Sequence, residues 1–160
     1  MEGQTAGIDV RRYLRSQGIF DEDSALIIIL DVAIELGTLH SHGIIHGNVR
    51  PQNIWIRRND RRGEIIPPGK GHYLPPERAQ DYYAPEQVQG KIITPATDVY
   101  SLGLVMYEML TCQLPFDGHK MHTPIPQHIE SLIMRCRQVN PELRYHNGVE
   151  LAHALEVIPH

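Results

Sequence analysis

The sequence is poor in the residues that define several common classes of protein. Its 160 residues include two cysteines, one tryptophan and two phenylalanines, and Lys and Arg do not outnumber Asp and Glu. Two isolated cysteines, Cys112 and Cys136, form no disulfide framework and indicate reduced thiols in a cytosolic protein. The net charge of −4 gives no basic excess for binding nucleic acid. We therefore expect a cytoplasmic protein that does not bind nucleic acid.

Long apolar runs and targeting signals are also missing. No stretch of about 18 uncharged apolar residues occurs, which argues against a membrane span. The first residues are polar and acidic and show no signal-peptide pattern. What remains is a chain that is 41% hydrophobic and has the length of one ordinary globular domain, residues 1–160.

Hydrophobic periodicity and capping residues predict a mainly α fold. Asp21 is a good N-cap for a long, largely buried helix, and Gly43 follows its end. A short amphipathic helix that ends at Gly18 precedes it. Residues 6–9 are expected to be irregular. The predicted helices cover about residues 9–17, 22–41, 97–111, 127–138 and 147–157, and the predicted short strands cover about 54–56 and 64–66.

One eight-residue stretch carries the most specific signal. Residues 46–53 read His-Gly-Asn-Val-Arg-Pro-Gln-Asn and lead into Ile-Trp-Ile. The stretch resembles the catalytic loop of eukaryotic-type Ser/Thr protein kinases, H-R-D-x-K-P-E-N, which also enters a short strand. In that resemblance Asn53 keeps a magnesium-binding position, Arg50 replaces the phosphate-neighbouring Lys, and His46 is a packing residue of the loop.

Further motifs of the same family lie at matching places downstream. Ala84-Pro85-Glu86 matches A-P-E, residues 98–103 match D-x-W-S-x-G, and residues 140–144 match N-P-x-x-R. The resemblance implies that Glu86 pairs with the buried Arg144 and that Asp98 holds the backbone of the catalytic loop. It spans nearly the whole chain and implies the helical C-terminal lobe of a kinase. The N-terminal lobe is then absent, and the substrate-docking helix, expected between residues 116 and 140, is shortened or missing.

The chain departs from the family where the chemistry is done. Asn48 stands where the family has its catalytic Asp, and an amide has no proton acceptor suited to general-base catalysis. Pro67 stands where the family has the metal-binding Asp of D-F-G, and no glycine-rich phosphate loop or phosphate Lys is found. A hard divalent cation needs several oxygen ligands, which Asn53 alone does not supply. We expect no catalytic residues, no metal site and no cofactor.

Two kinds of residue allow a second interpretation. Asn53 either binds magnesium or braces the loop with its amide, and bracing is favoured because the second metal ligand is gone. The spacings His40-x-His42 and His119-x-x-His122 could attract zinc, but neither has cysteine or carboxylate companions at ligand spacing.

Trp55 is the most informative single residue for binding. Strand alternation sends it to the face opposite Ile54 and Ile56. By the resemblance it replaces a small aliphatic residue on the floor of the adenine pocket, where it would fill the space that adenine needs. An apolar side chain exposed there would mark an interaction surface, whereas local packing is the alternative.

The sequence therefore predicts a catalytically inactive kinase-like lobe, a pseudokinase, that acts as a scaffold or regulatory module. We expect a protein partner, either a foreign protein or a second copy bound through the face around Trp55. Two alternatives stay open: a nucleotide-binding sensor without turnover, and half of a kinase completed by a lobe in trans. Asn48 and Pro67 argue against the second alternative, since a supplied lobe restores neither.

Overall fold

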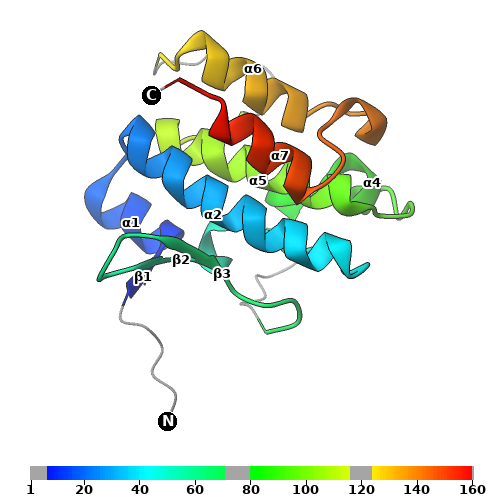
Figure 1. Cartoon of the computed structure of the whole chain (residues 1–160), viewed down its shortest axis with the longest axis horizontal. Coiled ribbons are helices and arrows are strands. Elements are labelled where there is room, and N and C mark those ends of the chain that lie inside the picture. Colours follow the sequence, from blue (N-terminus) through cyan, green and yellow to red (C-terminus); the bar gives the residue numbers. More distant parts are fainter. Residues whose placement is uncertain (1–6, 71–79, 116–123, 160) are drawn as a thin grey trace.

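The computed structural model describes residues 7–70, 80–115 and 124–159, which form a helical layer with a small sheet on one side (Figure 1). The helices are α1 (Val10–Gln17), α2 (Glu22–Ser41), α4 (Pro85–Val88), α5 (Pro95–Thr111), α6 (Gln127–Cys136) and α7 (Gly148–Glu156). The strands are β1 (Gly7–Asp9), β2 (Ile54–Arg57) and β3 (Gly63–Ile65). Three short 3-10 turns cover Pro51–Asn53, Gln80–Tyr82 and Pro141–Leu143. The prediction of a mainly α fold with short strands is confirmed.

The sheet is antiparallel, in the order β1-β2-β3. The prediction that residues 6–9 are irregular is wrong for residues 7–9, because they form β1 and pair with β2. Three residues are too few to show strand alternation, so only the distant partner strand reveals β1. Trp55 lies between Asp9 on β1 and Glu64 on β3 in this register. The buried Ile54 and Ile56 point to the opposite face.

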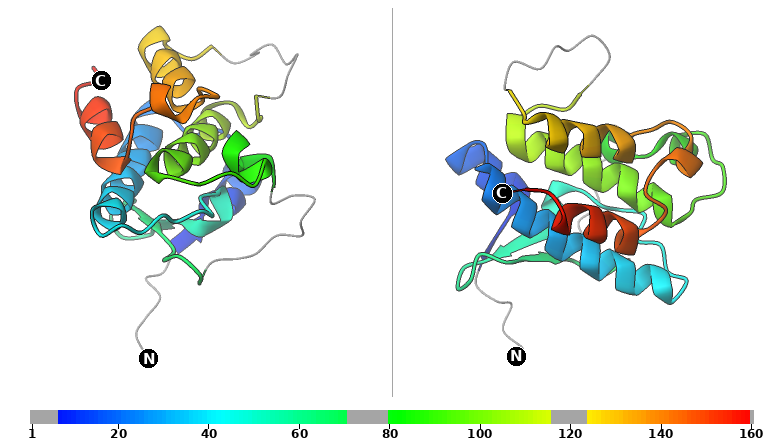
Figure 2. Two further views of the ribbon diagram at one scale, coloured as in Figure 1. Left: turned by 90° about the vertical axis from the view of Figure 1, so that its right-hand side faces the viewer. Right: turned by 45° about the horizontal axis from the view of Figure 1, so that its top comes forward.

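Helix α5 forms the centre of the helical layer. The two views in Figure 2 show it surrounded by α2, α6 and α7. All residues of α5 from Ala96 to Thr111 are buried except Tyr100, which explains its nearly continuous apolar sequence. A helix that is apolar all round must be enclosed by other elements. The core therefore runs the full length of α5.

Helix α2 is the longest element and links the core to the sheet. Asp21 caps it as predicted, since its carboxylate accepts the backbone N–H of Ser24 at 3.0 Å. By length and composition alone, α2 would suffice to cross a membrane. In this fold it packs against α5, α7 and β3, and its buried residues include Ile29, Val32 and Leu36. Those contacts are typical of the core helix of a globular domain.

The remaining helices begin and end close to their expected positions. The helix expected over residues 97–111 begins at Pro95, and the one expected over 127–138 ends at Cys136. The shortened docking helix was predicted within a region of which residues 116–123 lie outside the described structure.

Candidate functional site

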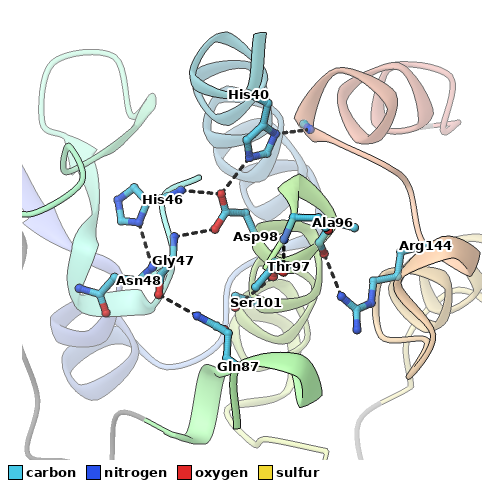
Figure 3. Close-up of polar contacts among 12 residues, drawn as sticks. His40, His46, Gly47, Asn48, Gln87, Ala96, Thr97, Asp98, Ser101 and Arg144 are labelled. Atoms are coloured by element: carbon cyan, nitrogen blue, oxygen red, sulfur yellow. Dashed lines mark hydrogen bonds and ion pairs between the residues drawn. The ribbon is translucent and has the colours of Figure 1, made fainter. Parts of the chain in front are cut away.

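Asp98, in the first turn of α5, holds the loop that precedes β2. Its two carboxylate oxygens accept the backbone N–H groups of His46 and Gly47, each at 2.8 Å (Figure 3). Gly47 adopts φ +74°, a conformation that glycine reaches without strain. Asp98 is only 1% exposed, so its hydrogen bonds are shielded from water. The carboxylate thus serves the backbone of the loop, in the role that the sequence motif implied.

His40 on α2 extends this network to α7. Its Nε2 lies 2.8 Å from Asp98 Oδ2, and its Nδ1 accepts the backbone N–H of Gly148 at 3.0 Å. Because a backbone N–H can only donate, the ring proton is on Nε2 and points at the carboxylate (Figure 3). Sequence reasoning weighed His40 as a zinc ligand and as part of the stretch that leads into the loop, but it did not predict this role. Both of its nitrogens are already engaged, and the Nδ1 of His42 lies 2.8 Å from Thr38 O.

The ring of His46 fixes the loop against the end of the sheet. Its Nδ1 accepts the backbone N–H of Asn48 at 3.1 Å, and its Nε2 donates to the carbonyl of Ile66 at 2.6 Å. The residue is 7% exposed. Both ring nitrogens therefore have structural partners, which agrees with the packing role that the resemblance implied.

The polar side chains of the loop bind one another. Arg50 is buried, and its guanidinium donates to the amide oxygen of Asn48. Asn53 is also buried, and its Nδ2 donates to the backbone carbonyl of Asn48 at 3.0 Å. The amide of Asn53 thus braces the loop, the interpretation favoured above. None of these three side chains is a carboxylate.

The chain turns sharply after β3. The backbone N–H of Lys70 donates to the carbonyl of Pro67 at 3.2 Å, and Gly69 has φ +78°. A proline followed by a glycine with positive φ is typical of a type II turn. No carboxylate enters the site from this turn. Within the described ranges, no three His, Cys, Asp or Glu side chains gather to hold a metal ion. His119 and His122 lie outside those ranges.

Glu86 and Arg144, 58 residues apart, form a buried bidentate ion pair. Arg144 Nη1 and Nη2 donate to Glu86 Oε2 and Oε1 at 2.7 and 2.9 Å. Arg144 is completely buried and also donates to the carbonyl groups of Ala96, Gln138 and Val139. The structure therefore brings together the two residues that the motifs implied as partners. The pair joins α4 to the segment before α7.

Burial and hydrogen bonding act in opposite directions on Glu86. Burial alone would raise the pKa of its carboxyl, but hydrogen bonds from Arg144 and Thr97, with the Arg144 charge, lower it below the ordinary value. Thr97 Oγ1 donates to Glu86 Oε2 at 2.8 Å. The carboxylate is thus charged and fully engaged at neutral pH. It is a structural group, not a free acid.

A second polar cluster was not predicted from the sequence. The guanidinium of Arg11 on α1 donates to Tyr82 and to Glu108 of α5, and the Tyr82 hydroxyl donates to Glu108 at 3.0 Å. Burial, followed by the charge of Glu108, raises the pKa of Tyr82. Glu108 in the otherwise apolar part of α5 was the available signal, since a buried acid needs a partner. This cluster ties α1 to the core.

Trp55 is less exposed than the sequence suggested. It is half-buried and is not among the large apolar side chains that are exposed. Those are Ile19, Ile27, Ile34, Ile44, Val88, Ile92, Ile93, Met134, Val139, Leu143, Val149 and Val157. On its face of the sheet, its cross-strand neighbours are the acidic residues Asp9 and Glu64.

Comparison with known proteins identifies the family. Residues 1–156 match the model of the protein kinase domain. The chain is 27% identical to a probable serine/threonine-protein kinase PknB of Lactococcus lactis, over 86% of this chain and 23% of that protein. It is 29% identical to the serine/threonine-protein kinase PknB of Mycolicibacterium smegmatis, over 91% of this chain and 28% of that protein.

It is also 26% identical to the serine/threonine-protein kinase PrkC of Bacillus subtilis, over 91% of this chain and 26% of that protein. The chain thus spans about a quarter of the length of these relatives. The 174-position alignments exceed the 160 residues of this chain, so those relatives carry additional residues inside the matched region. With the loop, the buried ion pair and this match in agreement, the chain belongs to the protein kinase domain family and is related to Ser/Thr kinases.

Proposed function

We propose that this chain is a catalytically inactive kinase-like domain, a pseudokinase, that acts in the cytoplasm as a protein-interaction or scaffold module. The observation that carries the proposal is the loop around Asn48. The position that the family motif gives to the catalytic base holds an amide, and that amide accepts a hydrogen bond from the buried Arg50. Two free thiols, Cys112 and Cys136, fit the reducing compartment.

Phosphoryl transfer in this family depends on positioning and on charge stabilisation. Loss of a general base typically costs a factor of about 10² to 10⁴ in rate. The turn at Pro67 also places no carboxylate beside Asn53, which leaves the magnesium position of the motif with one amide. Both general-base catalysis and magnesium binding are therefore expected to be impaired. Neither loss is repaired by another segment of protein bound next to the loop.

The bonds that the domain keeps are architectural. Asp98 still holds the loop and Glu86 still pairs with Arg144, so the fold stays intact where the chemistry is missing. A rigid domain without turnover is suited to binding a partner protein. The module is expected to need neither nucleotide, metal, nucleic acid nor membrane.

The names of the relatives favour a second candidate, namely Ser/Thr phosphoryl transfer by a protein that includes this domain. The test is transfer of radiolabelled phosphate from Mg-ATP to a mixture of Ser/Thr peptides. It compares wild type with Asn48→Asp, which restores a carboxylate at the base position, and with Asn53→Ala, which removes both the amide of the magnesium position and the brace to the Asn48 carbonyl. A thermal melt with and without Mg-ATP accompanies each sample.

We expect no transfer by the wild type, no gain in Asn48→Asp because the metal position stays incomplete, and no shift of the melting temperature with Mg-ATP. Transfer by the wild type, whether or not Asn53→Ala abolishes it, would overturn the proposal. A rise in melting temperature with Mg-ATP, without phosphate transfer, would make the domain a nucleotide-binding sensor.

A further inference from the structure

A cavity of about 260 Å³ lies between the sheet, α1 and the start of α2, away from the loop at Asn48. Three segments meet there: β1 with α1, the α1–α2 turn with the start of α2, and, distant from both in sequence, β2 with the turn that follows it. The residues that line it are Gly7, Ile8, Tyr13, Phe20, Ser24, Ile28, Ile56, Arg57, Arg58 and Arg61. No residue of the kinase motifs is among them.

The floor of the cavity is apolar and well ordered by packing. Phe20, Ile28 and Ile56 are each less than 8% exposed and belong to the core. The ring of Tyr13 stacks on Phe20 with centroids 4.0 Å apart and 27° between the ring planes. The two stacked rings and the branched aliphatic side chains give the cavity an apolar lining that suits an aromatic or short alkyl group.

The rim of the cavity is positively charged. Every charged residue that lines it is an arginine: Arg57, Arg58 and Arg61. Arg57 already pairs with Asp60 at 3.0 Å and with Glu64 at 3.1 Å. Arg58 is exposed and has no hydrogen bond or ion pair with any residue that the structure describes. Its guanidinium is therefore available to a ligand.

Arg61 occupies a position where glycine would be free of strain. Its φ is +58°, and its N–H donates to the carbonyl of Arg57, which closes the turn. The hydrogen bonds from Ser24 are the main cause of the lowered pKa of Asp21, and the charge of Arg61 contributes further. Arg61 thus lies near one carboxylate, whereas Arg58 carries the uncompensated charge of the rim.

We propose that this cavity binds a small organic anion with an apolar body, of the class of aryl or short-chain carboxylates. The apolar body would lie on Tyr13 and Phe20, and the carboxylate would face Arg58 and Arg61. The volume suits one or two rings and is below that of a typical drug-sized site. A neutral molecule of the same shape gains only the apolar part of this interaction. The proposal does not depend on whether the domain catalyses phosphoryl transfer.

The test uses 2-naphthoate as the probe and its neutral isostere 2-naphthamide as the control ligand. Affinity is measured by isothermal titration, and the site is located by amide chemical-shift changes. We expect 2-naphthoate to bind more tightly than 2-naphthamide, with the largest shift changes at Ser24, Ile28 and Ile56. Its affinity should fall as salt rises, because an exposed charge interaction is screened, and that of 2-naphthamide should not.

Arg58→Gln should weaken 2-naphthoate about threefold, within the range of exposed ion pairs, and Arg58→Glu should weaken it further because the new charge repels the carboxylate, while 2-naphthamide is unaffected. Lys91→Gln removes one exposed positive charge away from the cavity and should change neither affinity. Equal affinities for the two ligands, equal effects of Arg58→Gln and Lys91→Gln, or shift changes elsewhere in the chain would each overturn the proposal. Absence of binding at millimolar 2-naphthoate would overturn it as well.

Discussion

Arg144 is completely buried, and Glu86 is the one carboxylate described beside it. Replacing Arg144 by Met would leave the Glu86 charge in the interior without its partner and free three backbone carbonyls. We expect a loss of roughly 3–5 kcal/mol in the free energy of unfolding. Urea denaturation followed by circular dichroism measures it. A loss below about 1 kcal/mol would show that the pair is hydrated in solution.

The double variant Glu86→Leu with Arg144→Met separates the two contributions. Removing both charges abolishes the unpaired buried carboxylate, so the double variant should be more stable than Arg144→Met alone. It should remain less stable than wild type, because the carbonyls of Ala96, Gln138 and Val139 still lose their donor.

Glu35 on α2 provides a pH-dependent test at the same scale. Burial, with smaller contributions from the nearby Glu64 and Asp31, raises the pKa of its carboxyl, although the N–H of Ile65 donates to it at 3.2 Å. A raised carboxyl pKa means that the ionised form costs stability at neutral pH, and that this cost disappears as pH falls through the raised value.

Glu35→Gln keeps an acceptor for Ile65 and removes the charge. We expect it to raise the free energy of unfolding at pH 7 by on the order of 0.5 kcal/mol, a modest gain because the side chain is partly exposed. The gain should vanish near pH 4. Glu156→Gln, at an exposed acid on α7, is the control and should show no such pH-dependent gain. Destabilisation by Glu35→Gln at pH 7 would contradict the raised pKa assigned to the Glu35 carboxyl.

The sequence predicted the role of a residue where its partner is close in sequence or where a family motif implies it. The Asp21 cap follows from a residue three positions from its partner, and the Glu86–Arg144 pair from two linked motifs. His40 was missed, because its partners Asp98 and Gly148 lie 58 and 108 residues away. The local match of residues 39–46 to the stretch that precedes the family's loop marks His40, but it does not identify these partners.

At the scale of elements, the crossing of α2 and α7 depends on two glycines. A Cβ at Gly148 would lie closer to the N atom of Gly37 and the carbonyl of Ala33 than side-chain carbons approach backbone atoms. A Cβ at Gly37 would meet Val149 at 2.9 Å. The two helices therefore pack backbone to backbone, and the same approach brings the N–H of Gly148 to His40.

Gly148→Ala should push α7 away from α2 and break the bond to His40. Overpacking typically costs about 1–3 kcal/mol, and the lost hydrogen bond adds about 1 kcal/mol. We expect a total loss of about 2–4 kcal/mol in the free energy of unfolding, measured by urea denaturation. His153→Ala, an exposed position on the same helix, should change stability by less than about 0.5 kcal/mol. Equal effects of the two variants on stability would show that α7 can move away from α2 at little cost in free energy.

Long elements were predictable and short ones were not. α2 and α5 carry enough apolar residues to fix their type from sequence, whereas β1 has three residues and exists only through its pairing with β2. The short helix α4 likewise follows a Pro-rich segment that shows no helical period. Short elements are stabilised by distant partners, which periodicity does not reveal.

At the scale of the whole molecule, exposed apolar side chains are spread over several elements, and we compare two regions as candidates for self-association. One is the sheet face around the half-buried Trp55. The other is the end of α4 with the turn after α4, where Val88, Ile92 and Ile93 are 57%, 89% and 38% exposed. Self-association through either region would bury its apolar side chains. The sequence directed attention to Trp55, whereas the structure exposes Ile92 more.

Sedimentation velocity of the purified chain across protein concentration decides between the two surfaces. If the sheet face mediates self-association, Trp55→Ala should shift the monomer–dimer midpoint at least about tenfold to higher concentration, the effect of losing a central aromatic contact. Ile92→Ala, the matched control at an exposed apolar side chain, should leave the midpoint unchanged. The converse result would move the interface to the turn after α4 and contradict the assignment of Trp55. Added Mg-ATP should have no effect on the midpoint, because the proposed module binds no nucleotide. A wild type that stays monomeric at all concentrations would contradict self-association and leave a foreign protein as the partner.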